Sequence, residues 1–173
     1  MAGTWSTLRR ITRHRWFHLR AAFYPSIPTP LQERLAQQVA ASEQRHSGQI
    51  RICIESALPM SYLWRQASAR ERAITLFGKL RVWDTEHNNG VLIYLLLADQ
   101  AIEIVADRGV SQRIPAAQWD AMAKRLGRAL AAGQWEQGLF QALEEVSALM
   151  TTEWPAHPSA VQTNELPDAP WVA

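Results

Sequence analysis

The chain has 173 residues, of which 47% are hydrophobic, and this is enough apolar material for one domain with a single core. A single cysteine, Cys53, excludes an internal disulfide and a metal site built from several cysteines. The net charge of +2 is unevenly distributed, because five arginines and no acidic residue lie within residues 1–24. The excess of basic residues is therefore confined to the N-terminal end of the chain and does not indicate a nucleic-acid-binding domain.

Residues 1–24 alternate arginines with bulky apolar side chains such as Trp5 and Trp16. Two interpretations remain open: a basic helix that lies on an anionic membrane surface, or an arm that packs against its own domain. No apolar stretch typical of a secretory signal follows the arginines, and the longest apolar run, 91–98, is far too short to span a bilayer. We therefore expect a cytoplasmic protein, with peripheral attachment to the inner membrane as the alternative.

Strands and helices alternate in the central part of the chain. Apolar alternation or an unbroken apolar run predicts strands at 49–55, 91–97 and 101–106. Capping residues and apolar stripes predict helices at 29–46, 68–83, 115–132 and 135–150. The strand–helix–strand order predicts a crossover between parallel strands, and the short turn after Leu97 predicts a hairpin. The fold class is therefore α/β, with a mixed sheet between helices.

Composition divides the chain into three parts. Residues 1–28 form the basic arm and a proline-containing linker, and residues 29–151 form the α/β domain. Residues 152–173 are rich in proline and small side chains, which predicts a disordered tail.

A polar loop before the second strand supplies the first candidate site. Asp84, Glu86, Asn88 and Asn89 lie in this loop, and Asp107 follows the third strand. If the second and third strands form a hairpin, all five residues meet at one end of the sheet. Carboxylate and amide oxygens suit Ca²⁺ or Mg²⁺ better than Zn²⁺, and so few carboxylates predict a weak site. The alternative is a surface turn in which these side chains cap local backbone groups.

Three further residues have reactive side chains. Cys53 is expected to be a buried structural thiol, because no phosphate-cradling loop with an arginine follows it. His46 and His87 are candidate general bases or metal ligands, since parallel pairing of the first two strands would bring them to one end of the sheet. The alternative is that each is a polar loop residue.

Four segments of the chain resemble the TPM domain family. They are His46–Arg51, Arg81–Asp84 leading into Asn88–Ile93, Ile102–Gly109, and Gly133–Gly138. The resemblance covers about residues 30–150. It implies a three-layer α/β/α sandwich, and it places Asp84, Asn88, Asn89 and Asp107 in the loop region where some bacterial members bind calcium or magnesium.

The family includes an acid phosphatase, proteins of photosystem II repair and a receptor accessory protein, so the resemblance leaves several functions open. Many members have a signal peptide and a membrane helix, and neither is expected here. Many also have a Leu-x-Asp motif after the hairpin, which residues 108–115 replace with a sequence that contains no aspartate.

We therefore expect a non-catalytic accessory module, divalent-metal-binding, that assists membrane or envelope proteins. The protein partner is not identified, but an anionic membrane surface is a candidate through residues 1–24, and nucleic acid is not expected. The alternatives are a metal-dependent acid phosphatase and a purely structural interaction domain.

Overall fold

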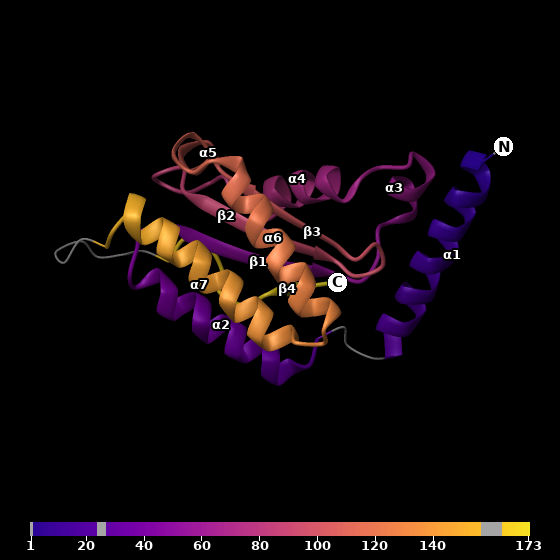
Figure 1. The fold of residues 1–173 in the computed structure, drawn as a ribbon, viewed down its shortest axis with the longest axis horizontal. Helices are drawn as coiled ribbons and strands as arrows, with labels where there is room; N and C mark the ends of the chain where they lie inside the picture. The colour runs from indigo at the N-terminus through magenta and orange to yellow at the C-terminus, as the bar shows by residue number, and fades with distance from the viewer. Residues whose placement is uncertain (1, 24–26, 157–163) are drawn as a thin grey trace.

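A mixed four-stranded sheet with strand order β3-β2-β1-β4 forms the centre of the fold (Figure 1). The computed structural model describes residues 2–23, 27–156 and 164–173, so part of the predicted linker, at 24–26, and part of the predicted tail, at 157–163, lie outside the described residues. The strands are β1 (Gln49–Glu55), β2 (Gly90–Leu96), β3 (Ala101–Ala106) and β4 (Trp171–Val172). β1 runs parallel to β2, and β2 is antiparallel to β3, as the sequence predicts.

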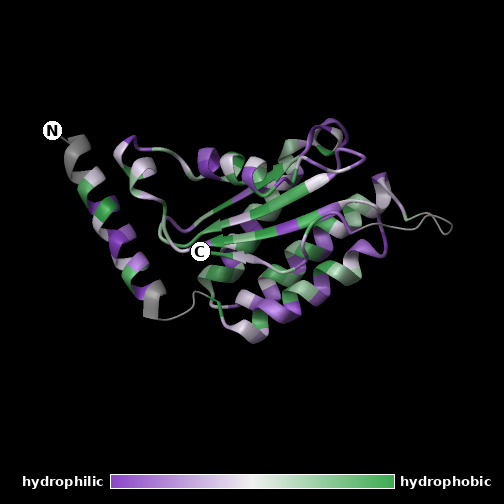
Figure 2. Ribbon diagram, turned by 180° about the vertical axis from the view of Figure 1, so that it is seen from behind, coloured by the Kyte–Doolittle hydropathy of each residue, from purple (hydrophilic) through white to green (hydrophobic). Residues whose placement is uncertain are grey.

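Helices cover both faces of the sheet and make the fold a three-layer α/β/α sandwich. They are α1 (Ala2–Phe23), α2 (Thr29–Glu43), α3 (Met60–Trp64), α4 (Ala69–Lys79), α5 (Arg108–Arg113), α6 (Ala116–Ala131) and α7 (Trp135–Glu153). The apolar faces of α2, α6 and α7 form one core with the sheet, and α3 and α4 form a second core on the opposite face. Figure 2 shows that the strands between these layers are mainly hydrophobic.

The alternation of β1 sends its side chains into the two cores. Ile50, Ile52 and Ile54 pack in the core beneath α2 and α7, and Cys53 packs in the core beneath α4. Every residue of β1 and β2 is buried. The sheet is therefore covered on both sides, as the unbroken apolar run of β2 predicts.

The end of the chain differs from the predicted disordered tail. Residues 171–172 form the edge strand β4, which pairs in parallel with Cys53 and Ile54 of β1. The side chain of Gln49 accepts hydrogen bonds from the backbone N–H groups of Glu165 and Leu166 at 2.9 and 3.0 Å. Main-chain pairing and buried polar side chains order this segment, and composition alone does not reveal either.

Local side-chain and backbone conformations set the boundaries of α4. Ser68 caps α4 by accepting a hydrogen bond from the N–H of Glu71, as the capping-box sequence predicts. The sequence predicted that this helix would continue to about residue 83, but α4 ends at Lys79. Arg81, two residues later, adopts a positive φ of 55°, which is not helical. α5 is a short helix that the sequence did not predict.

The N-terminal arm is a helix that packs across the end of the sheet, beside the turn between β2 and β3 (Figure 1). The buried ring of His14 donates from Nε2 to Asp99 at 3.0 Å and accepts at Nδ1 from the N–H of Leu58 at 3.0 Å. Arg10 and Arg13 bind the same carboxylate. Among the described helices, none is both long enough and apolar enough to cross a membrane.

Candidate metal site at the loop end of the sheet

The loop before β2 and the segment after β3 meet at one end of the sheet, which we call the loop end (residues 84–90 and 107–109). The N–H of Asp107 donates to the carbonyl of Gly90 at 2.9 Å. A Cβ atom on Gly109 would lie 2.6 Å from the carbonyl oxygen of Asn88, so the two backbones touch there. The hairpin therefore brings the two segments together as the sequence predicts.

Asn89 is the most enclosed residue of the loop end. Its side chain is fully buried, its N–H donates to the Thr85 hydroxyl at 3.0 Å, and its Nδ2 donates to the carbonyl of Ser47 at 3.1 Å. Within the described residues, the amide oxygen Oδ1 is buried and has no hydrogen-bond partner. An unpaired buried acceptor costs free energy, so this oxygen is a candidate to accept a hydrogen bond or to bind a cation.

Asp107 contributes a second oxygen of the same kind. Its Oδ1 accepts the hydrogen bond from the N–H of Arg108 at 2.6 Å and caps α5. Its Oδ2 is buried and also has no partner among the described residues. Two hard oxygen atoms without donors, one on each of two touching segments, match the ligand chemistry of Ca²⁺ and Mg²⁺.

The other three predicted ligands are at the surface. Asp84 is half exposed, and its carboxylate lies 3.9 Å from Arg81. Glu86 and Asn88 are exposed, and the N–H of Glu86 donates to the carboxylate of Glu165 at 2.9 Å. Across residues 2–23, 27–156 and 164–173, no three His, Cys, Asp or Glu side chains gather to hold a metal ion. The cluster thus has one carboxylate at its centre and not three.

His46 and Glu43 lie beside this end in the segment that leads into β1. His46 donates from Nδ1 to the carbonyl of Gly48 at 3.0 Å, and burial lowers the pKa of its imidazole to about 4. Glu43 accepts from the N–H of Ile50 at 2.8 Å, and burial raises the pKa of its carboxyl to about 8. His87, in contrast, is exposed. Glu43 was missed because a carboxylate near the end of a helix normally faces solvent.

A family model described as the TPM domain matches residues 28–149, which is more than half of the chain. The chain belongs to the TPM domain family. No curated protein matches the sequence.

Two solved structures share the TPM fold of this chain. The NMR structure of the BA42 protein from the psychrophilic bacterium Bizionia argentinensis is 22% identical with a TM-score of 0.74, over 86% of this chain and 96% of that chain. The N-terminal domain of a P. gingivalis protein is 15% identical with a TM-score of 0.60, over 77% of this chain and 83% of that chain. At these identities the likeness shows the fold alone.

The single thiol of this TPM domain lies inside the protein. Cys53 is fully buried in β1, and burial raises the pKa of its thiol far above the ordinary range. A thiol that stays protonated and has no access to solvent is a poor nucleophile. The geometry therefore agrees with a structural role.

A buried ionic network on the α4 side of the TPM domain also has a structural explanation. Arg72 donates to both carboxylate oxygens of Glu55, at 2.5 and 2.9 Å, and Tyr94 donates to the same carboxylate at 2.7 Å. The guanidinium of Arg72 also lies 5.0 Å from the ring centre of Tyr62. Every charged group in this network has a partner, so it fixes how α4 sits on the sheet.

Proposed function

We propose that this chain is a non-catalytic TPM-domain module that binds Ca²⁺ or Mg²⁺ at the loop end and assists membrane or envelope proteins. The observation that carries the metal proposal is the pair of buried, unpartnered oxygens, Asn89 Oδ1 and Asp107 Oδ2. The two atoms belong to touching segments, and a cation that reached both would neutralise the carboxylate and join the segments. Backbone carbonyls of His87 and Asn88, which lie against Gly109, are further oxygen donors at the same contact.

The ligand set predicts a weak site. One carboxylate with amide and carbonyl oxygens gives a dissociation constant of about 10⁻⁴–10⁻³ M, in the range of weakly charged calcium sites. Arg108 is adjacent to Asp107 and opposes a cation, although its side chain is exposed and screened by solvent. Ca²⁺ tolerates irregular coordination better than Mg²⁺, and we therefore expect Ca²⁺ to bind more tightly.

An NMR titration of the full chain with Ca²⁺ and Mg²⁺ tests the metal proposal. Amide shifts should concentrate at residues 84–90 and 107–109, and they should vanish in Asp107→Asn, which can still cap α5. Asp84→Asn is the matched control, because its exposed carboxylate lies in the same loop and should leave binding within about twofold of the parent value. Amides at the loop end that stay unmoved at millimolar metal would contradict the proposal.

The outer face of α1 supports the membrane part of the proposal. Leu8, Trp16 and Leu19 are each more than half exposed, while His14 on the opposite face is buried against the domain. Arg15 is exposed between them. A basic helix with an exposed tryptophan and leucines is the composition that binds an anionic membrane surface.

Sedimentation with anionic vesicles tests this face. Replacing Leu8, Trp16 and Leu19 together by serine should abolish co-sedimentation, because it removes the apolar contacts but keeps the arginines. Replacing Met60 and Ile74, which are also exposed but lie on α3 and α4, is the control and should not change it. Equal sedimentation of the parent chain and the triple variant would show that α1 does not hold the membrane.

Phosphatase activity is the competing function within this family. A phosphate-ester assay on the pure protein, with and without Mg²⁺, separates the two. We expect no turnover, because the thiol is buried and the loop end contains no candidate nucleophile with a base in contact. Metal-dependent turnover that is lost in Asp107→Asn would make the loop end a catalytic site.

A further inference from the structure

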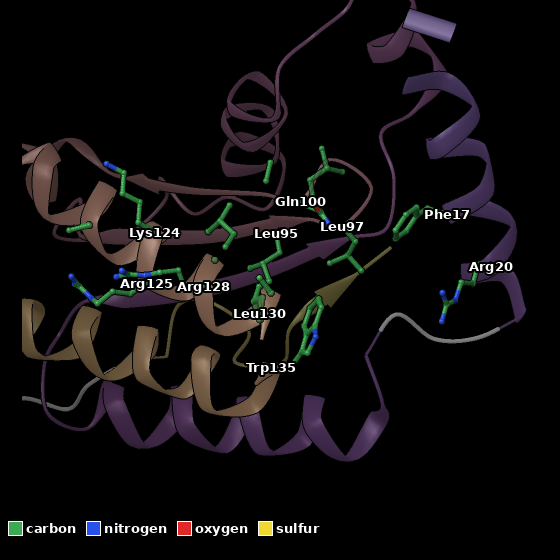
Figure 3. A pocket seen from close by; sticks show the side chains of 16 residues that line it. Phe17, Arg20, Leu95, Leu97, Gln100, Lys124, Arg125, Arg128, Leu130 and Trp135 are labelled. Carbon is green, nitrogen blue, oxygen red and sulfur yellow. The ribbon is translucent and has the colours of Figure 1, made fainter. Parts of the chain in front are cut away.

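A large apolar cavity lies at the opposite end of the sheet from the loop end. It has a volume of about 1010 Å³, at the upper end of the ~300–1,000 Å³ typical of small-molecule sites. Its walls come from α1, from the ends of β2 and β3 with the turn between them, from α6 and from the first residue of α7 (Figure 3). The side chains that form its apolar surface are Phe17, Leu95, Leu97, Ile102, Leu130 and Trp135.

Basic side chains surround this apolar surface. Lys124, Arg125 and Arg128 lie along one side in Figure 3, and Arg20 lies across from them on α1. Arg125 is neutralised by Glu145, with N–O distances of 2.5–3.2 Å. In the part of the chain that the structure describes, no acidic side chain pairs with Lys124 or Arg128. The cavity thus has an apolar interior and uncompensated positive charge at its edge.

A glycine in the middle of α6 keeps the cavity open. Gly127 lines the wall, and a Cβ atom placed there would touch only the end of the Ile102 side chain, at 3.6 Å. Glycine is unfavourable inside a helix, and Gly127 has neither a positive φ nor a tight contact that would require it. What its missing side chain does provide is space above Ile102.

From this arrangement we infer that the cavity binds a medium-chain fatty acid, with the acyl chain on the apolar walls and the carboxylate at Lys124 and Arg128. Charge complementarity selects an anion, and the apolar lining selects a chain over a nucleotide or a sugar phosphate, which would need polar partners on the interior walls. In Figure 3, Leu97, Trp135 and Phe17 lie on the far side of the cavity from Lys124, so an acyl chain can extend from the basic residues toward α1.

A displacement assay on the full chain tests the inference. Dansylamino-undecanoate serves as the fluorescent probe, and dodecanoate and its methyl ester serve as competitors below their micelle concentrations. We expect saturable binding with blue-shifted fluorescence, and displacement by the acid roughly tenfold better than by the ester because only the acid has a charge for the basic residues.

Two independent variants locate the site. Lys124→Glu with Arg128→Glu should weaken dodecanoate by about tenfold or more and remove its advantage over the ester. Lys79→Glu, an exposed lysine on α4, is the matched control and should stay within about twofold. Gly127→Leu should place a side chain in the cavity beside Ile102 and weaken probe binding, while the helical circular dichroism spectrum is retained because helix interiors favour leucine over glycine.

Several outcomes would overturn the inference. If the probe does not bind, or if Gly127→Leu leaves its binding unchanged, the cavity is not a fatty-acid site. Equal affinity for the acid and the ester would show that Lys124 and Arg128 do not bind the carboxylate. Finally, sedimentation with anionic vesicles that depends on Lys124 and Arg128, without any probe binding, would show that these side chains meet a membrane surface instead.

Discussion

The two ends of the sheet present opposite chemistry. At the loop end, backbones touch, and the unsatisfied groups are buried oxygens on Asn89 and Asp107. At the turn end, which comprises residues 97–101 with α1, side chains leave a cavity, and the uncompensated groups are cations on α6. The same α/β sandwich therefore offers a negative, tightly packed site and a positive, open one. Packing density and charge are set by local residues at each end, not by the fold.

Gly90→Ala gives the largest expected effect and probes the tight packing of the loop end. A Cβ atom at this position would lie 1.9 Å from the backbone carbonyl oxygen of Val82, which cannot move without shifting the chain before the loop. We expect the free energy of unfolding to fall by about 3 kcal/mol or more, as for other overpacked core sites. Urea denaturation measures it. A decrease of less than about 1 kcal/mol in the free energy of unfolding would show that the backbone at the loop end can shift to accommodate the methyl group.

Asp99→Ala probes how the turn end holds α1. Burial by itself would raise the pKa of the Asp99 carboxyl, but the hydrogen bonds from His14 and Arg10 hold it well below its usual range. Without this carboxylate the buried His14 N–H loses its acceptor, which weakens docking of α1 by about 2–3 kcal/mol.

Amide hydrogen exchange measures the docking of α1 in Asp99→Ala. Exchange should accelerate throughout α1 and remain unchanged in β1 and β2. Asp84→Ala, which changes an exposed aspartate at the other end, is the control. If the amides of α1 remain protected from exchange in Asp99→Ala, Asp99 does not hold α1 on the domain.

Glu43→Gln tests, through the pH dependence of stability, the electrostatics of the buried carboxyl beside the loop end. Burial raises the pKa of the Glu43 carboxyl from its ordinary value to about 8, so the folded state binds a proton more tightly than the unfolded state does. The contribution of Glu43 to the free energy of unfolding is therefore fully present below about pH 4.5, and it is lost as the pH rises through about 8. Glutamine keeps the acceptor for the N–H of Ile50 and has no charge.

The expected result for Glu43→Gln is a stability gain of about 1–2 kcal/mol at pH 9 and little change near pH 4, measured by thermal unfolding across pH. Gln49→Glu is an informative comparison, since it adds a buried carboxylate close by and should reverse the trend. A variant whose gain does not depend on pH would assign the effect to packing.

Gly127→Ala gives the smallest effect and probes the open packing of the turn end. Its Cβ atom would make one ordinary contact, with Ile102 at 3.6 Å. We expect a stabilisation of about 0.5–1 kcal/mol from the better helix propensity of alanine. The contrast with Gly90→Ala is the point of the measurement, because the same chemical change has opposite signs at the two ends. Destabilisation by Gly127→Ala would show that the cavity wall is less open than the contacts indicate.

Local patterns revealed the fold far better than they revealed the sites. The alternation of β1, the apolar run of β2 and the cap at Ser68 are encoded within a few residues, and the structure confirms them. β4 was missed because its order depends on pairing with β1, which is more than a hundred residues away in the sequence. The tail's proline content describes only its local preference.

The sequence predicted which segments meet at the candidate metal site, but it did not predict which side chains turn inward. The hairpin argument brought Asp107 to the loop before β2, but it could not distinguish Asn89, which turns inward, from Asp84, which turns outward. The cavity at the turn end had no sequence signal, because its walls come from three separate segments. Sites that one loop encodes are visible in a sequence, and sites that packing creates are not.

The anchoring of α1 has a thermodynamic consequence for the cavity. Phe17 and Arg20 belong to the cavity wall, so a ligand that touches them binds the docked helix better than the undocked one. Linkage then requires reciprocity: the factor by which docking strengthens the ligand is the factor by which the ligand strengthens docking. Asp99, which is not itself one of the residues that line the cavity, thus sets the apparent affinity of the cavity through the population of the docked state.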